Sequence, residues 1–288
     1  MGRNLKQHHV NIGGIELLNP VMPASGVAGY GEEYAQIADI NKLGAIVTKT
    51  ITVKPKRGNP PPRIWECDSA IVNSVGLENV GIEKFLSDKL PLLLKFKPPA
   101  IVSIGGTSPD EFALLAETLD SAGIQAVELN LSCPNVGSSH LIAQDARETV
   151  KILRATRKKT KLPIIVKLAP DVTDIVPIAK AAVRAGADVL AIANAYLSYV
   201  LRNDGKPVFS RGYAGLSGPA IKPLTLRLVR QVHNALPDVP IIGIGGIMSV
   251  RDALDYFDSG ARAIAIGTGI LIDPFIPFKI IDGLKTNC

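Results

Sequence analysis

Eight short runs of β-branched and small apolar residues alternate with longer segments of helical periodicity along almost the whole chain. The runs are Val21–Ala24, Ala45–Thr50, Ala100–Gly105, Ala126–Leu131, Pro163–Leu168, Asp188–Asn194, Pro240–Gly245 and Arg262–Gly267. Short strands that alternate with helical segments indicate βαβ units and a parallel sheet. Eight strands is the number that a closed (β/α)8 barrel requires. The sequence therefore predicts an α/β fold of the TIM-barrel type.

The segments between these runs place apolar residues at helical spacing. They span Glu33–Leu43, Pro109–Ala122, Asp145–Lys159, Asp174–Ala185, Pro219–Leu236 and Ser249–Ser259. Capping residues begin two of them, in Asp171-Val-Thr-Asp174 and at Ser249. An open doubly wound sheet also alternates strand and helix, but no Gly-x-Gly-x-x-Gly follows the first run, where a dinucleotide-binding sheet carries it. The barrel is favoured, and the open sheet is the alternative.

Two long connections interrupt the alternation. Residues Lys54–Asn79 follow the second predicted strand, and residues Asn194–Gly218 follow the sixth. Both begin at the carboxyl end of a strand, where barrels build their active sites, so we expect insertions that act as lids. No linker divides the chain, and residues 1–288 are expected to form one domain.

Charge and cysteine usage exclude several classes of protein. The 32 Lys and Arg against 26 Asp and Glu give a net charge of +6 without a run of like charges, which favours anionic small molecules over nucleic acid. No apolar run reaches the roughly 18 residues of a membrane span, so no membrane partner is expected. Cys67, Cys133 and Cys288 lack Cys-x-x-Cys spacing, which suits the cytoplasm. The His8-His9 pair has no further ligands nearby, and no metal site is expected.

The last two predicted strands end in glycine-rich loops, Gly243-Ile-Gly245-Gly246 and Ile266-Gly267-Thr268-Gly269. Backbone N–H groups that no Cβ atom shields can bind a phosphate dianion at the start of a helix. In barrels, the loops after strands seven and eight frequently hold a ligand phosphate. The alternative is that these glycines serve only tight turns.

Polar residues stand at the ends of other predicted strands, where a barrel core requires apolar ones. Lys49, Asn130, Lys167 and Asn194 all occupy such positions. An unpaired buried ammonium group is costly, so each lysine needs an anionic partner. That partner is either a ligand or a carboxylate of the protein itself.

Cys133 lies in the loop Ser132-Cys-Pro-Asn135 directly after the fourth predicted strand. This position near the barrel mouth makes the thiol a candidate acid or base. A lone cysteine also serves as a small core residue, which is the alternative. No His and Asn are arranged as a cysteine protease requires, and His140 cannot be assigned as an activating base.

Several motifs together resemble the class 1 dihydroorotate dehydrogenases, in particular the type 1B branch, whose partner subunit carries FAD and an iron–sulfur cluster. The resemblance extends from about Val21 to Leu284. The motifs are Pro23-Ala-Ser25-Gly26, Thr48-Lys49-Thr50, Arg57-Gly-Asn-Pro-Pro-Pro-Arg63, Asn73-Ser-Val-Gly76-Leu77, Asn130-Leu-Ser-Cys133-Pro-Asn135, Gly215-Leu-Ser-Gly218-Pro-Ala-Ile-Lys222-Pro223 and the two glycine loops.

The resemblance implies that the barrel binds FMN and a dihydropyrimidine. The implied cofactor-binding residues are Ala24, Ser25, Gly26, Lys49, Thr50, Ser103, Asn130, Lys167, Ala193, Ser217, Gly218, Gly245, Gly246, Gly267 and Thr268. The implied substrate-binding residues are Lys49, Asn73, Ser74, Val75, Gly76, Leu77, Asn130, Asn135, Asn194 and Ala195. Lys167 would supply positive charge near the N1–O2 edge of the flavin.

The implied reaction is FMN-dependent oxidation of (S)-dihydroorotate to orotate in de novo pyrimidine (UMP) biosynthesis. Cys133 and Lys49 are the implied catalytic residues: the cysteine removes the C5 proton while a hydride leaves C6 for flavin N5. The implied assembly is a homodimer, and a heterotetramer with the FAD and iron–sulfur subunit. Alternatives are another flavin-dependent dihydropyrimidine or tRNA dihydrouridine oxidoreductase, or a flavin-binding scaffold without catalysis.

The sequence departs from the family pattern at two places. Ala195 follows Asn194, where the family usually has Thr or Ser, so a hydroxyl contact to the substrate is lost unless Tyr196 or Ser198 replaces it. The loop Val136–His140 is shorter than is common in the type 1B branch, which leaves the electron acceptor open.

Overall fold

The computed structural model of the chain describes residues 9–131 and 142–286, and its centre is an eight-stranded parallel sheet. The strands are β3 (Val21–Pro23), β4 (Ile46–Val47), β7 (Ala100–Ile104), β8 (Ala126–Asn130), β9 (Ile164–Lys167), β10 (Val189–Ile192), β13 (Ile241–Ile244) and β14 (Ala263–Ile266). They are paired in the order β3-β14-β13-β10-β9-β8-β7-β4, and every neighbouring pair is parallel. Each strand lies within one of the eight predicted runs, so the prediction of the barrel is confirmed.

The sheet curls until its two edge strands, β3 and β4, approach each other. The amide of Gly44, just before β4, donates a hydrogen bond of 2.7 Å to the carbonyl of Val21, and the amide of Leu18 donates one of 3.1 Å to the carbonyl of Gly44. A Cβ atom on Gly44 would lie 1.9 Å from the carbonyl oxygen of Asn19. Glycine is therefore required where the barrel comes closest to closure.

The amino end of the barrel interior is apolar and is capped by an N-terminal hairpin of β1 (Val10–Ile12) and β2 (Ile15–Leu17). Ile12, Ile15 and Leu17 are buried with the inward-facing residues of the strands. The turn consists of two glycines with positive φ, and a Cβ atom on Gly13 would meet Val189 at the start of β10. The hairpin thus closes the amino end of the barrel. It is not among the elements expected from the sequence, although two glycines between apolar residues are a hairpin signal.

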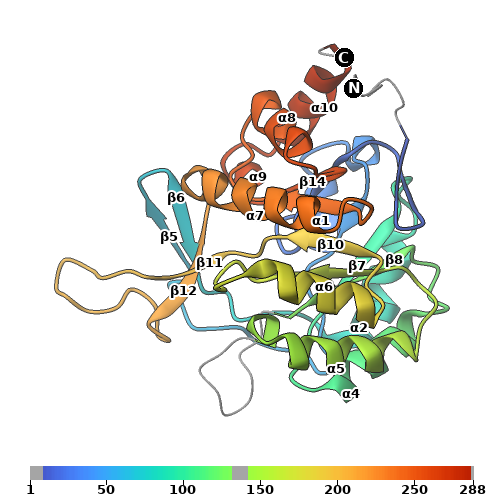
Figure 1. Cartoon of the computed structure of the whole chain (residues 1–288). Helices are drawn as coiled ribbons and strands as arrows, with labels where there is room; N and C mark the ends of the chain where they lie inside the picture. The colour runs from blue at the N-terminus through green and yellow to red at the C-terminus, as the bar shows by residue number, and fades with distance from the viewer. Residues whose placement is uncertain (1–8, 132–141, 287–288) are drawn as a thin grey trace.

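Helices cover the outer face of the sheet (Figure 1). They are α2 (Gly81–Lys84), a π-helical turn (Phe85–Lys89), α3 (Leu90–Leu93), α4 (Pro109–Leu119), α5 (Ala146–Arg157), α6 (Ile175–Ala185), α7 (Lys222–Ala235), α8 (Val250–Asp258), α9 (Thr268–Ile272) and α10 (Ile276–Thr286), with 3-10 turns at Ile142–Gln144 and Pro219–Ile221. The predicted caps are confirmed: the side chains of Asp174 and Ser249 accept hydrogen bonds from the amides of Val176 and Asp252.

The predicted helix Glu33–Leu43 is wrong in its extent. The structure has only the short helix α1 (Glu32–Ala35) and a separate 3-10 turn at Ile40–Lys42. The Asp39 carboxylate accepts a hydrogen bond of 3.2 Å from the amide of Asn41, so it caps a new turn. Short polar side chains that bond to nearby backbone compete with helix propagation in this way.

The two insertions combine into one antiparallel sheet of four strands. These are β5 (Ile64–Cys67) and β6 (Ala70–Asn73) from the first insertion, and β11 (Tyr196–Tyr199) and β12 (Tyr213–Ser217) from the second. Their order is β11-β12-β6-β5, with Asn73 opposite Gly215. In Figure 1 this insertion sheet projects from the left side of the barrel. In the part of the chain that the structure describes, no helix is long and apolar enough to cross a bilayer.

Candidate active site

Most of the predicted site residues follow the carboxyl ends of the barrel strands, and the parallel order brings these ends to one edge. Ala24, Ser25 and Gly26 follow β3; Lys49 and Thr50 follow β4; Ser103 is in β7; Asn130 and Lys167 end β8 and β9; Ala193, Asn194 and Ala195 follow β10; Gly245 and Gly246 follow β13; and Gly267 and Thr268 follow β14. Cys133, Asn135 and His140 lie outside the described residues.

Four of these side chains form a hydrogen-bonded chain across the mouth of the barrel. The hydroxyls of Ser103 and Thr50 are 2.9 Å apart, and the Asn130 amide donates to Thr50 Oγ1 at 3.0 Å. The Asn194 amide donates to Asn130 Oδ1 at 3.3 Å, while Asn194 Oδ1 accepts from the Ala195 amide at 2.8 Å. Residues from β7, β8 and the loops after β4 and β10 therefore hold one another in place.

Lys167 is buried at the carboxyl end of the barrel, where two side chains of the protein bind its ammonium group. Its ammonium donates to Ser25 Oγ at 2.7 Å and to Glu128 Oε1 at 3.0 Å. The Lys167 and Glu128 side chains are only 5% and 4% exposed. The carboxylate partner considered from the sequence is thus present within the protein. Glu128 was overlooked as a partner, although a charged residue inside an apolar strand is a signal in itself.

Lys49 also faces a carboxylate, but in a more open setting. Its Nζ atom lies 3.6 Å from Glu78 Oε2, and the same oxygen accepts a 2.8 Å hydrogen bond from Nη1 of Arg63. Because these side chains are partly exposed, water screens the pair, which contributes little to stability. The ion pair instead fixes a position, because it joins Lys49, after β4, to Glu78 of the first insertion.

The segment Asn73–Leu77 is held by the motif Arg57–Arg63, to which the sequence assigns no role of its own. The Asn59 amide donates to the Ser74 carbonyl at 3.1 Å and to Ser74 Oγ at 2.8 Å, and the Asn59 backbone donates to Val75 at 2.9 Å. A Cβ atom on Gly76 would lie 2.6 Å from the Asn59 side chain. The close approach explains the glycine, and Asn59 is a residue that sequence reasoning missed.

Ala195 directly precedes β11, which contains the two residues considered as replacements for the family's hydroxyl, Tyr196 and Ser198. A Cβ atom on Gly215 would lie 2.8 Å from the Cβ of Ala195, so the two strands of the second insertion nearly touch here. The Ser198 hydroxyl donates to the Ala214 carbonyl at 2.8 Å and is used within the insertion sheet. Tyr196 packs against the apolar cluster between the sheet and its helices. Replacement of the family's hydroxyl by Tyr196 or Ser198 stays a prediction.

The glycines after β13 lie close to the second insertion and form what we call the glycine cradle: Gly218, Gly245, Gly246, Gly267 and Thr268. Gly245 and Gly246 have φ of +139° and +63°, and a Cβ atom on Gly246 would lie 2.9 Å from the carbonyl oxygen of Gly218. The Thr268 hydroxyl donates to Ser217 Oγ at 2.9 Å. Gly245 and Gly246 therefore form a tight turn that packs closely against Gly218.

A buried tyrosine supports the cradle from behind. The Tyr256 hydroxyl donates to the carbonyl of Gly245 at 2.6 Å. Burial raises the pKa of Tyr256 well above its ordinary value, so the hydroxyl remains a donor at every physiological pH. The orientation of the peptide after Gly245 is fixed by this bond.

Comparison with known proteins agrees with this arrangement. A family model described as dihydroorotate dehydrogenase matches residues 7–287. A protein of Desulforudis audaxviator is 47% identical over 92% of this chain and 87% of its own length, and one of Pelobacter propionicus is 45% identical over 96% and 91%. Both are named dihydroorotate dehydrogenase B (NAD(+)), catalytic subunit. With identity this high over almost the full length of both chains, the protein belongs to the dihydroorotate dehydrogenase family.

Proposed function

We propose that this protein oxidises (S)-dihydroorotate to orotate with FMN, as one step of de novo pyrimidine (UMP) biosynthesis. The observation that carries the proposal is the polar chain Ser103–Thr50–Asn130–Asn194 across the barrel mouth, next to the buried Lys167. An apolar barrel gains nothing from such a set of residues unless a polar ligand binds there. Family membership supports dihydroorotate as that ligand.

The residues at the barrel mouth fit FMN. The backbone at Gly26 and Gly267 is open: a Cβ atom would find no neighbour within 4 Å at Gly26, and only Ala24 at 3.8 Å at Gly267. Of these two, Gly267 belongs to the glycine cradle, and bare backbone of this kind suits a phosphate group. We assign the phosphate to the glycine cradle, and the ring and ribityl to Ala24, Ser25, Lys49, Thr50, Ser103, Asn130, Lys167, Ala193 and Ser217. When bound, FMN supplies the acceptor for the hydride that leaves C6 of the substrate.

The protein's own groups then have distinct roles. Lys167 keeps a positive charge at the cofactor site, and Glu128 and Ser25 fix its ammonium group. Asn130 and Asn194 each offer a donor and an acceptor, which suits the alternating N–H and C=O groups of a dihydropyrimidine. Lys49 supplies a cation for an anionic substrate.

We propose that Cys133 is the base that removes the proton from C5 of the substrate. This role rests on its sequence motif alone, since the residue lies outside the described part of the chain. A thiol serves as a base for a carbon acid when its pKa is near the working pH. Asn73, Ser74, Val75, Gly76, Leu77, Asn135 and Ala195 complete the proposed substrate site. The segment 73–77 is positioned for this by Asn59.

The protein's assembly is part of the proposal. The relatives are named as catalytic subunits of NAD(+)-dependent enzymes, which supports a partner subunit that passes electrons onward. We propose a homodimer of this chain joined to an FAD and iron–sulfur subunit. Purification of homodimers alone, with direct turnover of fumarate, would contradict this assignment.

The test is anaerobic reduction of the bound flavin in a stopped-flow instrument. L-dihydroorotate is expected to bleach the flavin rapidly, and dihydrouracil, which lacks the carboxylate, is expected not to. Bleaching by dihydrouracil alone would favour a neutral dihydropyrimidine, which the missing hydroxyl at Ala195 would tolerate. If neither compound reduces a flavin-loaded protein, the proposed substrate is wrong.

A further inference from the structure

Lys222, the first residue of α7, forms ion pairs with two acidic residues of the neighbouring barrel helix α8. Its ammonium donates to Asp252 and, at 2.7 Å, to Asp255 Oδ2, and both acids belong to α8. The three side chains are between 17% and 24% exposed. One cation thus ties the start of α7 to two successive turns of α8.

The stem of the same lysine lies against the glycine cradle. A Cβ atom on Gly246 would lie 2.8 Å from Cβ of Lys222 and 3.1 Å from its backbone nitrogen. The carbonyl of Gly218 is 2.9 Å from the same point. Lys222 therefore forms part of the wall that sets the distance between Gly218 and Gly246.

Asp252 connects this contact to the other end of the loop. Its Oδ1 atom accepts from Lys222, while its Oδ2 atom accepts from the backbone of Met248 at 3.0 Å and from Ser249 Oγ at 2.8 Å. Met248 and Ser249 end the loop that begins at Gly245. A single carboxylate is thus bonded both to Lys222 and to the loop that carries the glycines.

The pKa values of Lys222 and Asp252 are both shifted in the direction that favours the charged form. Burial lowers the pKa of Lys222, but the hydrogen bonds to Asp252 and Asp255 more than offset it, so the pKa lies above its ordinary value. Burial raises the pKa of Asp252, but the bonds from Lys222, Ser249 and Met248 bring it below its ordinary value. The ion pair therefore persists across the neutral pH range.

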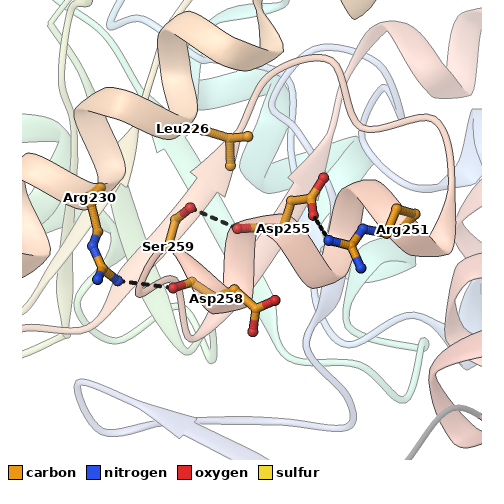
Figure 2. Close-up of a pocket in the computed structure, with 6 residues that line it drawn as sticks. All are labelled: Leu226, Arg230, Arg251, Asp255, Asp258 and Ser259. Atoms are coloured by element: carbon orange, nitrogen blue, oxygen red, sulfur yellow. Dashed lines mark hydrogen bonds and ion pairs between the residues drawn. The ribbon is translucent and has the colours of Figure 1, made fainter.

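Behind this contact, α7 and α8 border an open hollow of about 410 Å³ (Figure 2). Arg251 lies 2.9 Å from Asp255, and Arg230 donates to the carbonyl of Asp258 at 3.1 Å. Because both arginines already have partners on α8, the hollow gives no indication of a ligand. Arg251 instead provides a matched control, since it contacts the same Asp255 and its side chain is 76% exposed.

We propose that Lys222 is a positioning residue for the cofactor phosphate: by bonding to Asp252 and Asp255 it fixes the spacing of Gly218 and Gly246. This inference rests on the proposed function, which assigns the phosphate of FMN to the glycine cradle. Lys222 does not contact the phosphate in this scheme. It acts through the backbone groups whose distance it sets.

The test compares FMN with riboflavin, which has the same ring system and no phosphate. Both are titrated into the flavin-free protein, and binding is followed by flavin fluorescence. Lys222→Met is expected to weaken FMN binding about tenfold or more, because hydrogen bonds to a charged group are lost, and to leave riboflavin binding within about twofold. Lys222→Arg restores the cation and is expected to recover much of the loss, whereas Arg251→Met is expected to bind both flavins like the unaltered protein.

The outcomes separate the two levels of the proposal. If the unaltered protein binds FMN no more tightly than riboflavin, the phosphate assignment is wrong and this inference is overturned with it. If FMN is preferred but Lys222→Met changes neither flavin, or weakens both equally, only the role of Lys222 is overturned. Asp255→Asn is the second variant should Lys222→Met not fold: it keeps the bond to Asp252 and is expected to weaken FMN selectively but less.

Discussion

The Nζ atom of Lys167 lies 3.0 Å from Oε1 of Glu128, with both side chains almost completely buried between neighbouring strands β8 and β9. A buried ion pair is not a large source of stability, because desolvation offsets most of the attraction. Removing only one of the two side chains lowers the stability strongly, however, since the remaining buried charge is left without a partner. The pair is therefore best understood as a way to keep a cation at the barrel mouth.

Glu128→Ala is expected to lower the free energy of unfolding by about 3 kcal/mol, because it leaves the Lys167 ammonium buried beside Ser25 alone. The control is Glu117→Ala, which removes a 3.1 Å pair with Lys159 on the surface and should cost below about 1 kcal/mol. Urea denaturation of both variants measures the difference. Equal losses would show that the buried pair is no more important than the exposed one.

Cys133→Ser is expected to slow reduction of the flavin by dihydroorotate at neutral pH by about tenfold or more, while FMN remains bound. The reason is the pKa of the side chain, since a hydroxyl deprotonates far less readily than a thiol. Stopped-flow absorbance gives the rate, and the flavin content of the purified variant is the control. An unchanged rate would remove Cys133 from the proposed mechanism.

Gly246→Ala is expected to reduce both stability and flavin content, because the residue has φ of +63° and an added Cβ would lie 2.8 Å from that of Lys222. Gly205→Ala is the matched control: its φ is +77°, but no atom lies within 4 Å of the added carbon. It should lose about 1 kcal/mol from backbone strain alone and keep its flavin. The cradle assignment fails if the two variants retain flavin equally.

The Asp171 carboxylate accepts a 2.9 Å hydrogen bond from the amide of Leu197, and so joins the loop after β9 to the insertion sheet. Burial raises the pKa of Asp171, and the bond from Leu197 offsets this only in part. The folded state then holds the proton more tightly than the unfolded chain. Its contribution is therefore greatest below the ordinary pKa of 3.8 and falls as pH rises through the folded value.

Asp171→Asn removes this titration. The melting temperature of the unaltered protein should fall relative to that of the variant as pH is raised from about 4 to about 7, and the difference should then remain constant. Thermal unfolding of both proteins in one buffer series measures it. A difference that does not change with pH would show that Asp171 titrates alike in the folded and unfolded chains.

The barrel could be predicted because its signals are local. Each strand is a short apolar run, and each helix repeats its apolar residues at its own period, so neither needs information from distant parts of the chain. The helix expected at Glu33–Leu43 failed for an equally local reason, the Asp39 cap, which competes with the apolar period.

The insertion sheet could not be predicted, because it depends on pairing between residues far apart in the chain. The side chain of Asn73 bonds to the carbonyl of Gly215, 142 positions away, and no local pattern in either insertion identifies the other as its partner. The same holds for Glu78, whose position beside Lys49 depends on where the first insertion returns to the barrel. The motifs therefore predicted which residues belong to the candidate site, but they did not predict which of these residues contact one another.

The order of the chain gives the insertion sheet a consequence for biosynthesis. Its first hairpin, β5–β6, leaves the ribosome long before β12, so one edge of β6 has no partner while most of the barrel is being made. The last strand of the sheet ends at Ser217, whereas the cradle needs Thr268 of a 288-residue chain. Every residue of the insertion sheet is therefore synthesised before Thr268, the last residue of the cradle, which lies 51 positions after its hydrogen-bond partner Ser217.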